Sequence, residues 1–360
     1  KVIFLLFIIT AAAACGSGTE TAVSPTQTNP TTPVNTAPTV PAATTAGAPS
    51  GKIAFIQLDQ SGSAPQTNLV IYDVAAQTIT PLFTPPANSI LYAADFSPDD
   101  SQVALAYAPP PPPGDIQFGY TGLYQLQIGT DTPSLLIDKQ VADEIFFHPT
   151  WSPDGKHIVF SHMGPEDGSP TGFFQVTLER LNTETGETAV LAPDGIWARV
   201  SPDGSQIVYA YSEPTTQGNE LVIINADGSN PRKLTAFNDF VAVDSPVWSP
   251  DGRFIYFSAV TEDTLPPPTP TSFWDRLFGV KTALAHDIPS DWWRVPSNGS
   301  TPPERITEIR EIGLYGDFSP DGRYFAFIST TGLYIMEADG TNLSKVLETA
   351  VVGGALSWIP

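Results

Sequence analysis

Four histidines are the side chains of this sequence best suited to acid–base or metal chemistry: His148, His157, His162 and His286. His148 and His162 flank a predicted tight turn, which places them to approach each other across one hairpin. Neutral imidazole binds metals and acts as a general base near neutral pH, so such a pair would suit a metal-assisted lyase or hydrolase. No matching set of ligands is visible elsewhere in the sequence, and we favour a structural or surface role for these histidines.

The sequence carries none of the short motifs that mark common enzyme sites. It has no G-x-S-x-G nucleophile elbow, no H-E-x-x-H zinc motif and no phosphate-binding loop. A Ser/His/Asp triad stays open as an alternative, because its members need not be close in the chain. We therefore name no catalytic residue and no metal ligand, expect no cofactor, and favour a protein that is not an enzyme.

Cys15 is the only cysteine of the chain and follows a continuous apolar run over residues 2–9. This run is too short to span a bilayer permanently but has the length of a signal-peptide core. The residues Ala-Ala-Ala-Cys at 12–15 are similar to a bacterial lipobox. We predict that residues 1–14 are a lipoprotein signal peptide and that the Cys15 sulfur carries a diacylglycerol. The alternative is an incidental thiol beside a signal-peptidase site.

The segment from residue 16 to residue 50 consists almost entirely of Thr, Pro, Ala, Ser and Asn. Such a composition lacks the apolar content that a packed core needs, and it predicts disorder. Together with the lipidated Cys15, the segment reads as a stalk over residues 15–50 that holds a folded domain away from a membrane. Its Thr-Pro runs are compatible with O-glycans.

A Ser-Pro-Asp-Gly turn is repeated along the rest of the chain. Copies begin at residues 97, 152, 201, 249 and 319, and the first has Asp100 in place of Gly. In a tight turn Ser accepts a hydrogen bond, Pro presets φ, and Gly takes a positive φ. The turn itself explains the Asp of each copy, so we do not assign these carboxylates as ligands.

Each turn joins a first strand to a β-rich second strand, and two further strands follow, giving units of four strands at a period of 40 to 70 residues. This arrangement is typical of propeller blades. Residues 52–83 supply strands two to four of a blade that lacks its first strand. The C-terminal GGALSWIP matches a first strand, and its Trp358 takes the place of Trp151 and Trp248. The sequence therefore predicts six blades, with the C-terminal strand completing the first blade and removing exposed sheet edges.

The W/F-S-P-D-G strand pairs resemble the WD40-like repeats of TolB-type propellers, and the resemblance covers residues 51–360. It implies an all-β fold, a six-bladed β-propeller preceded here by the signal peptide and the disordered linker. It also implies, more loosely, a role in envelope protein complexes. TolB carries an additional α/β domain before its propeller, and nothing here corresponds to that domain. Prolyl-peptidase-type enzymes add a hydrolase domain to a similar propeller, and we expect none in this chain.

Binding by a propeller is expected where the first strand of each blade opens onto the central channel. Five residues before the turn motifs are our candidates at this mouth: Tyr92, His148, Trp197, Asp244 and Tyr315. Together they would form an aromatic, weakly polar funnel. The alternative is that most of them pack between blades. A metal-assisted lyase or hydrolase acting on carbohydrate would need His and carboxylate side chains to converge at the same mouth.

Residues 261–291 interrupt the fifth blade and contain apolar side chains at helical spacing. Phe273, Trp274, Leu277 and Phe278 would form one face of a short helix. If exposed, this face is an anchor for a partner or for a lipid headgroup region. The alternative is that the helix folds back onto the blade.

The chain has 38 acidic and 16 basic residues and a formal net charge of −22. This balance argues against nucleic acid and against direct adsorption to anionic lipid, since both need basic patches. We expect an envelope protein or a glycan as partner, contact with the membrane through the lipid anchor, and a monomer. The expected location is extracytoplasmic, at the cell surface or in the periplasm of a bacterium.

Overall fold

The computed structural model describes residues 47–61, 65–114, 120–141, 144–165, 174–212, 219–265, 288–349 and 351–360. Their regular structure consists of twenty-four β-strands, and Ala48–Pro360 form one compact unit. None of the described segments is a helix long and apolar enough to cross a membrane. The predicted signal peptide, Cys15 and the predicted helix at Phe273–Phe278 lie outside the described residues.

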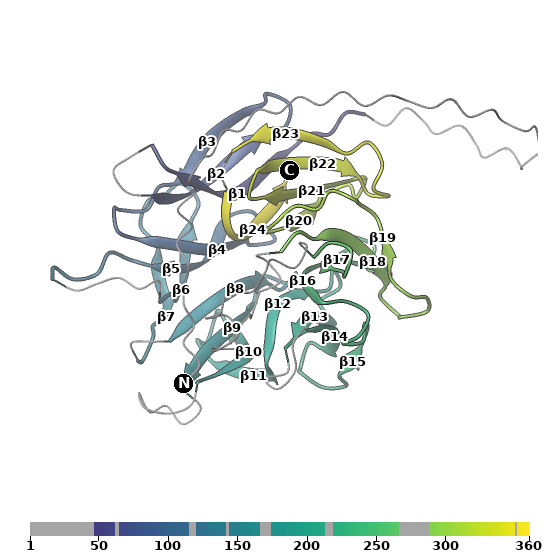
Figure 1. Cartoon of the computed structure of the whole chain (residues 1–360). Helices are drawn as coiled ribbons and strands as arrows, with labels where there is room; N and C mark the ends of the chain where they lie inside the picture. Colours follow the sequence, from purple (N-terminus) through teal and green to yellow (C-terminus); the bar gives the residue numbers. More distant parts are fainter. Residues whose placement is uncertain are drawn as a thin grey trace, which may run out of the picture. The chain divides into compact units, whose positions relative to one another are not determined.

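The first three blades each contain four antiparallel strands (Figure 1). From the inside outward, the first blade consists of β24 (Val351–Ile359), β1 (Lys52–Asp59), β2 (Gln66–Asp73) and β3 (Thr78–Phe83). The second consists of β4 (Ile90–Phe96), β5 (Gln102–Ala108), β6 (Gly122–Gln127) and β7 (Ser134–Ile137). The third consists of β8 (Ile145–Trp151), β9 (His157–Pro165), β10 (Phe174–Asn182) and β11 (Thr188–Pro193).

The other three blades repeat this pattern, and the outer strands of the fourth and fifth blades are only two residues long. The fourth consists of β12 (Gly195–Val200), β13 (Gln206–Tyr211), β14 (Glu220–Asn225) and β15 (Arg232–Lys233). The fifth consists of β16 (Ala242–Trp248), β17 (Phe254–Val260), β18 (Asp291–Pro296) and β19 (Glu304–Arg305). The sixth consists of β20 (Tyr315–Phe318), β21 (Tyr324–Ser329), β22 (Gly332–Glu337) and β23 (Ser344–Glu348). The predicted six-bladed β-propeller is confirmed.

Each Ser-Pro-Asp-Gly turn joins the first and second strands of a blade through the same hydrogen bonds. In the third blade, the Ser152 hydroxyl donates to Asp154 at 2.6 Å and accepts the His157 amide at 3.0 Å. Asp154 also accepts the Lys156 amide at 3.0 Å, and Gly155 has a φ of 69°. These bonds hold the pKa of the Asp154 carboxyl below its usual value. The turn thus uses its Asp as a structural acceptor, as the sequence indicates.

The C-terminal strand closes the ring as predicted. β24 pairs with β1 in antiparallel fashion, and Trp358 stands opposite Ile53. Trp151 stands opposite Ile158 in the third blade, and Trp248 opposite Ile255 in the fifth, in the same register. One parallel bridge also joins β24 to β4 of the second blade.

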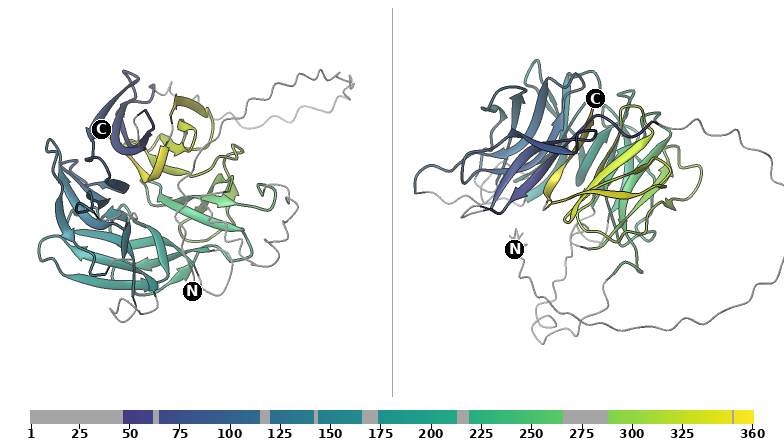
Figure 2. Two further views of the ribbon diagram at one scale, coloured as in Figure 1. Left: turned by 60° about the vertical axis from the view of Figure 1, so that its left-hand side comes forward. Right: turned by 90° about the horizontal axis from the view of Figure 1, so that it is seen from above.

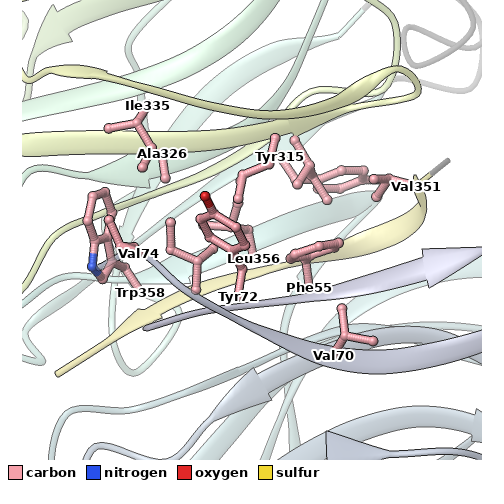
Figure 3. Close-up of a cluster of buried hydrophobic side chains, with 13 residues drawn as sticks. Phe55, Val70, Tyr72, Val74, Tyr315, Ala326, Ile335, Val351, Leu356 and Trp358 are labelled. Carbon is pink, nitrogen blue, oxygen red and sulfur yellow. The ribbon is translucent and has the colours of Figure 1, made fainter. Parts of the chain in front are cut away.

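The hydrophobic core lies between the blades. One cluster of buried side chains fills the space between each pair of neighbouring blades. Figure 3 shows the cluster at the point of closure, where Trp358 and Leu356 of β24 pack with Phe55 of the first blade and Ile335 of the sixth. Because the blades are covered on both faces, their second strands include nearly continuous apolar runs, as in β5, β13 and β17.

Candidate functional site at the central channel

The six innermost strands surround the central channel. β24, β4, β8, β12, β16 and β20 contact one another in this order, and β20 contacts β24 again. The views in Figure 2 show the blades arranged around this channel. A side chain on any of these strands therefore has neighbours from several blades, although these neighbours are far apart in the sequence.

Three neighbouring innermost strands are bulged at equivalent positions. The pairing register shifts in β8, β12 and β16, and His148, Trp197 and Ser245 in these shifts have φ values of 49°, 53° and 47°. A positive φ is uncommon for residues other than glycine. Bulges redirect side chains and occur often beside functional sites, and here all three residues line one cavity.

This cavity is narrow and is built from five blades. Besides the three bulged residues, Tyr315 of β20 and Gly354 of β24 line it. Its volume is about 20 Å³, which is enough for about one water molecule. Pockets that enclose small organic ligands are more than tenfold larger. The channel in this conformation can therefore take a small polar group or part of a partner's side chain.

Aromatic rings surround His148 at this level of the channel. Its imidazole lies 5.2 Å from the Trp197 ring, 5.0 Å from the Phe147 ring and 5.8 Å from the Tyr92 ring, measured between centroids. The His148 side chain is buried. The structure thus brings together four of the five predicted mouth residues: Tyr92, His148, Trp197 and Tyr315. Their role in binding stays a prediction.

Gly354 makes this gathering possible from the side of β24. A Cβ atom at residue 354 would lie 2.9 Å from Tyr315 Cε1 and 3.1 Å from His148 Cδ2. Both distances are shorter than ordinary carbon–carbon contacts. A side chain at this position would therefore push one or both rings away.

Asp244, the fifth predicted mouth residue, takes a different position. It is almost fully buried and is not among the residues that line the cavity. It stands opposite Ser258 in the β16–β17 pair. Burial raises the pKa of Asp244 to about 8, although hydrogen bonds with Ser258 and Ser245 act in the other direction. Its carboxyl group is thus mainly protonated at neutral pH.

A layer of charged side chains, which the sequence pattern did not single out, lies further along the innermost strands than the predicted mouth residues. Asp95 of β4 pairs with Arg199 of β12, at 3.3 Å between Oδ1 and Nη1. Asp317 of β20 has the equivalent position, directly before the aromatic residue of a turn motif, and the Arg199 charge acts on its carboxyl group. Burial raises the pKa of Asp317 to about 6, and a hydrogen bond from the Trp358 amide and the Arg199 charge oppose this shift. Burial also raises the pKa of Asp95, against the Arg199 charge.

The two histidines predicted to flank one turn have different surroundings. His148 stands in the channel, whereas His162 of β9 lies between the carboxylates of Glu144 and Glu179. Within the described segments, no three His, Cys, Asp or Glu side chains are arranged to hold a metal ion.

The fold is that of a TolB-like six-bladed β-propeller. The crystal structure of TolB from Acinetobacter baumannii has a TM-score of 0.62 at 17% identity, covering 86% of this chain and 67% of that chain. A putative TolB from Agrobacterium tumefaciens has a TM-score of 0.56 at 19% identity, covering 86% and 98%. At these identities the similarity establishes the fold and nothing further.

Similarity in sequence is more limited. No protein-family model matches the chain. An uncharacterized protein of Agrobacterium fabrum is 26% identical over 227 residues, which are 58% of this chain and 60% of that protein. The Tol-Pal system protein TolB of Francisella tularensis subsp. tularensis is 31% identical over 107 residues, 29% of this chain and 23% of that protein. The chain thus matches less than two thirds of the length of either relative.

Proposed function

We propose that this protein is a binding scaffold of the bacterial cell envelope, anchored through lipidated Cys15, which engages an envelope protein or a glycan at the channel mouth. The lipobox-like sequence before Cys15 and the stalk after it support the anchored, extracytoplasmic location. The TolB-like fold and the Tol-Pal relative support a role in an envelope protein complex.

The observation that carries this proposal is the convergence of His148, Trp197 and Tyr315 on one recess from three different blades. Each ring stands on a strand that is paired within its blade, so a partner would meet a preformed surface. Aromatic side chains are also the residues that contribute most to binding at protein interfaces. A glycan would use the same rings by stacking.

The alternative, a metal-assisted lyase or hydrolase acting on carbohydrate, has less support. Its ligand set would need His and carboxylate side chains that converge on the channel. Asp95 and Asp317 face Arg199 and backbone amides instead. His148 stands among aromatic rings. We therefore place the binding role first.

The experiment that tests the mouth is a pull-down of partners from the native envelope with the lipidated protein. It compares the partners captured by the wild type with those captured by the Trp197→Asn and His148→Asn variants. Asn is among the residues that tolerate a positive φ, so these changes remove the rings while preserving the bulges. Val190→Ala, at an exposed position of β11, is the matched control. We expect the captured partner to be lost in both mouth variants and kept in the control. Equal capture by all three variants would refute binding at the mouth.

Two further comparisons separate the parts of the proposal. A soluble version beginning at Gly51 tests whether capture needs the anchor, and Cys15→Ser should move the full chain out of the membrane fraction. Replacing residues 266–287 by a short Gly-Ser linker tests the predicted anchor residues Phe273, Trp274, Leu277 and Phe278. This deletion keeps Asp263, whose carboxylate pairs with Arg305 at 2.8 Å. Undiminished capture after the deletion would remove the anchor segment from the proposal.

A further inference from the structure

His162, on the second strand of the third blade, lies between two carboxylates. Its Nε2 atom is 2.7 Å from Glu144 Oε1, and its Nδ1 atom is 2.8 Å from Glu179 Oε1. The imidazole stacks on the Phe146 ring, with 4.4 Å between centroids and 6° between planes. Only 20% of the His162 side chain, 6% of Glu144 and 15% of Glu179 are exposed. Both ring nitrogens thus face carboxylate oxygens that are largely shielded from water.

With both carboxylates ionised, this arrangement suits the imidazolium form of His162. An imidazolium donates from both nitrogens, whereas neutral imidazole donates from one, and an ionised carboxylate only accepts. Burial by itself lowers the pKa of His162, but the hydrogen bonds and negative charges of Glu179 and Glu144 outweigh it, and this pKa lies above its usual value. Among the described residues, the charged groups that act on the ring are these two carboxylates. Its other neighbours include the Phe146 ring and Thr177, whose hydroxyl donates to Glu179.

Glu144 connects this cluster to the chain segment before β8. Its second oxygen, Oε2, accepts the backbone amides of Gln140 and Val141. Glu179 and His162 are instead fixed within the β9–β10 pair, where His162 stands opposite Thr177. The imidazolium therefore joins a connecting segment to two strands of the blade. The same segment leads into β8, which carries His148 to the channel.

We propose that Glu144, His162 and Glu179 form a pH-dependent tie, which holds the segment around Gln140 and Val141 against the third blade while His162 is protonated. Loss of the proton leaves one ring nitrogen without hydrogen, facing a carboxylate. The remaining N–H of His162 donates to Glu179, because the pairing of β9 with β10 holds Glu179 beside the ring. Glu144 then loses its ring partner, and the segment that it holds is released.

The direction of the pH dependence follows from the raised pKa of His162. The tie is fully formed below the unfolded-state value of about 6.5 and weakens as the pH rises through the higher value in the folded protein. For each unit by which the His162 pKa differs between the tied and the released states, the equilibrium constant for forming the tie changes about tenfold across the titration.

The test uses NMR on the folded protein, with the imidazole signals followed through a pH titration and amide hydrogen exchange measured at Gln140 and Val141. We expect His162 to titrate above its usual value, and the two amides to lose protection, corrected for intrinsic exchange, as the pH rises through that titration. Glu144→Gln removes one charge at constant size, and it should lower the His162 pKa and make the protection independent of pH. Glu184→Gln, at an exposed position of the same blade, should change neither.

Two results would overturn the tie. One is a wild-type His162 that titrates at or below about 6.5. The other is constant protection of Gln140 and Val141 across that titration. Both are measured on the unmodified chain, so they decide the matter even if Glu144→Gln fails to fold. Neither measurement involves the channel mouth, and the result is separate from the proposed binding function.

Discussion

The Asp317 carboxylate accepts a hydrogen bond from the Trp358 backbone amide, with 3.0 Å between Oδ2 and N. This bond joins the sixth blade to the strand that completes the first blade. Asp95 accepts the Trp151 amide at 2.7 Å in the same manner, from the second blade to the third. In both cases the carboxylate directly precedes the aromatic residue of a turn motif and accepts the amide of the equivalent tryptophan in the next blade. The charged layer of the channel therefore also links neighbouring blades.

Asp317→Ala should loosen the closure of the ring. The substitution leaves the partly buried Trp358 amide without its acceptor, and the loss of such a partner typically costs about 1–3 kcal/mol. We expect the free energy of unfolding, measured with urea at neutral pH, to fall by this amount. Asp131→Ala, at an exposed position of the second blade, is the control and should stay within about 0.5 kcal/mol of wild type. Similar values for the two variants would contradict a role for Asp317 in closure.

Trp248→Phe and Trp151→Phe offer a matched pair at equivalent positions of the turn motif. Both tryptophans are 7% exposed. The Trp248 indole donates to the Arg199 carbonyl at 3.0 Å, whereas the Trp151 indole nitrogen meets no acceptor among the described residues. We expect Trp248→Phe to cost about 1 kcal/mol more than Trp151→Phe, because only the former loses a hydrogen bond. Thermal and urea unfolding measure this difference. Equal costs would refute a stabilising hydrogen bond from the Trp248 indole to the Arg199 carbonyl.

Asp244→Asn should change the pH dependence of stability. The pKa of Asp244 is about 8 in the folded protein, and the usual value is 3.8. Between these values the folded state binds a proton that the unfolded state has released, so stability falls as the pH rises from about 4 to about 8. The slope has an upper limit of about 1.4 kcal/mol per pH unit.

Asparagine has no charge to bury, and the Asp244→Asn variant should lose this part of the dependence. Urea unfolding at pH values between about 4 and about 8 measures the slope of stability against pH. Asp131→Asn, at the exposed site, should retain the wild-type slope. If the slopes of Asp244→Asn and wild type coincide, Asp244 is ionised in the folded protein.

The blades and their closure could be predicted from the sequence because their determinants are local. Ser152, Asp154 and Gly155 fix a turn through bonds within six residues, and every copy repeats this chemistry. Trp358 could be matched to Trp151 by its position in the first strand of its unit, and the structure confirms that the two residues pair with the second strand in the same register.

The interior of the channel depends on contacts between distant residues and could not be predicted in the same way. The left-handed conformation of His148, Trp197 and Ser245 arises from the pairing of whole strands, and these three residues share no side-chain type. The pair of Asp95 and Arg199 joins residues 104 positions apart. One signal was present, since Asp95 and Asp317 both directly precede the turn aromatic. The polar side chain of Asp244 predicts a place at the channel mouth, but its strand places it in the interior.

Gly354→Ala tests the packing of the channel mouth directly. The added methyl group would come within 2.9 Å of Tyr315 and 3.1 Å of His148, and overpacking of this kind typically costs about 1–3 kcal/mol. We expect a lower free energy of unfolding and a changed near-ultraviolet circular dichroism spectrum, because aromatic rings must move. Gly47→Ala is the control, since a Cβ atom there meets nothing within 4 Å. Tolerance of Gly354→Ala with an unchanged spectrum would mean that the rings of the mouth are not held in contact with β24, and the preformed recess on which the binding proposal depends would be lost.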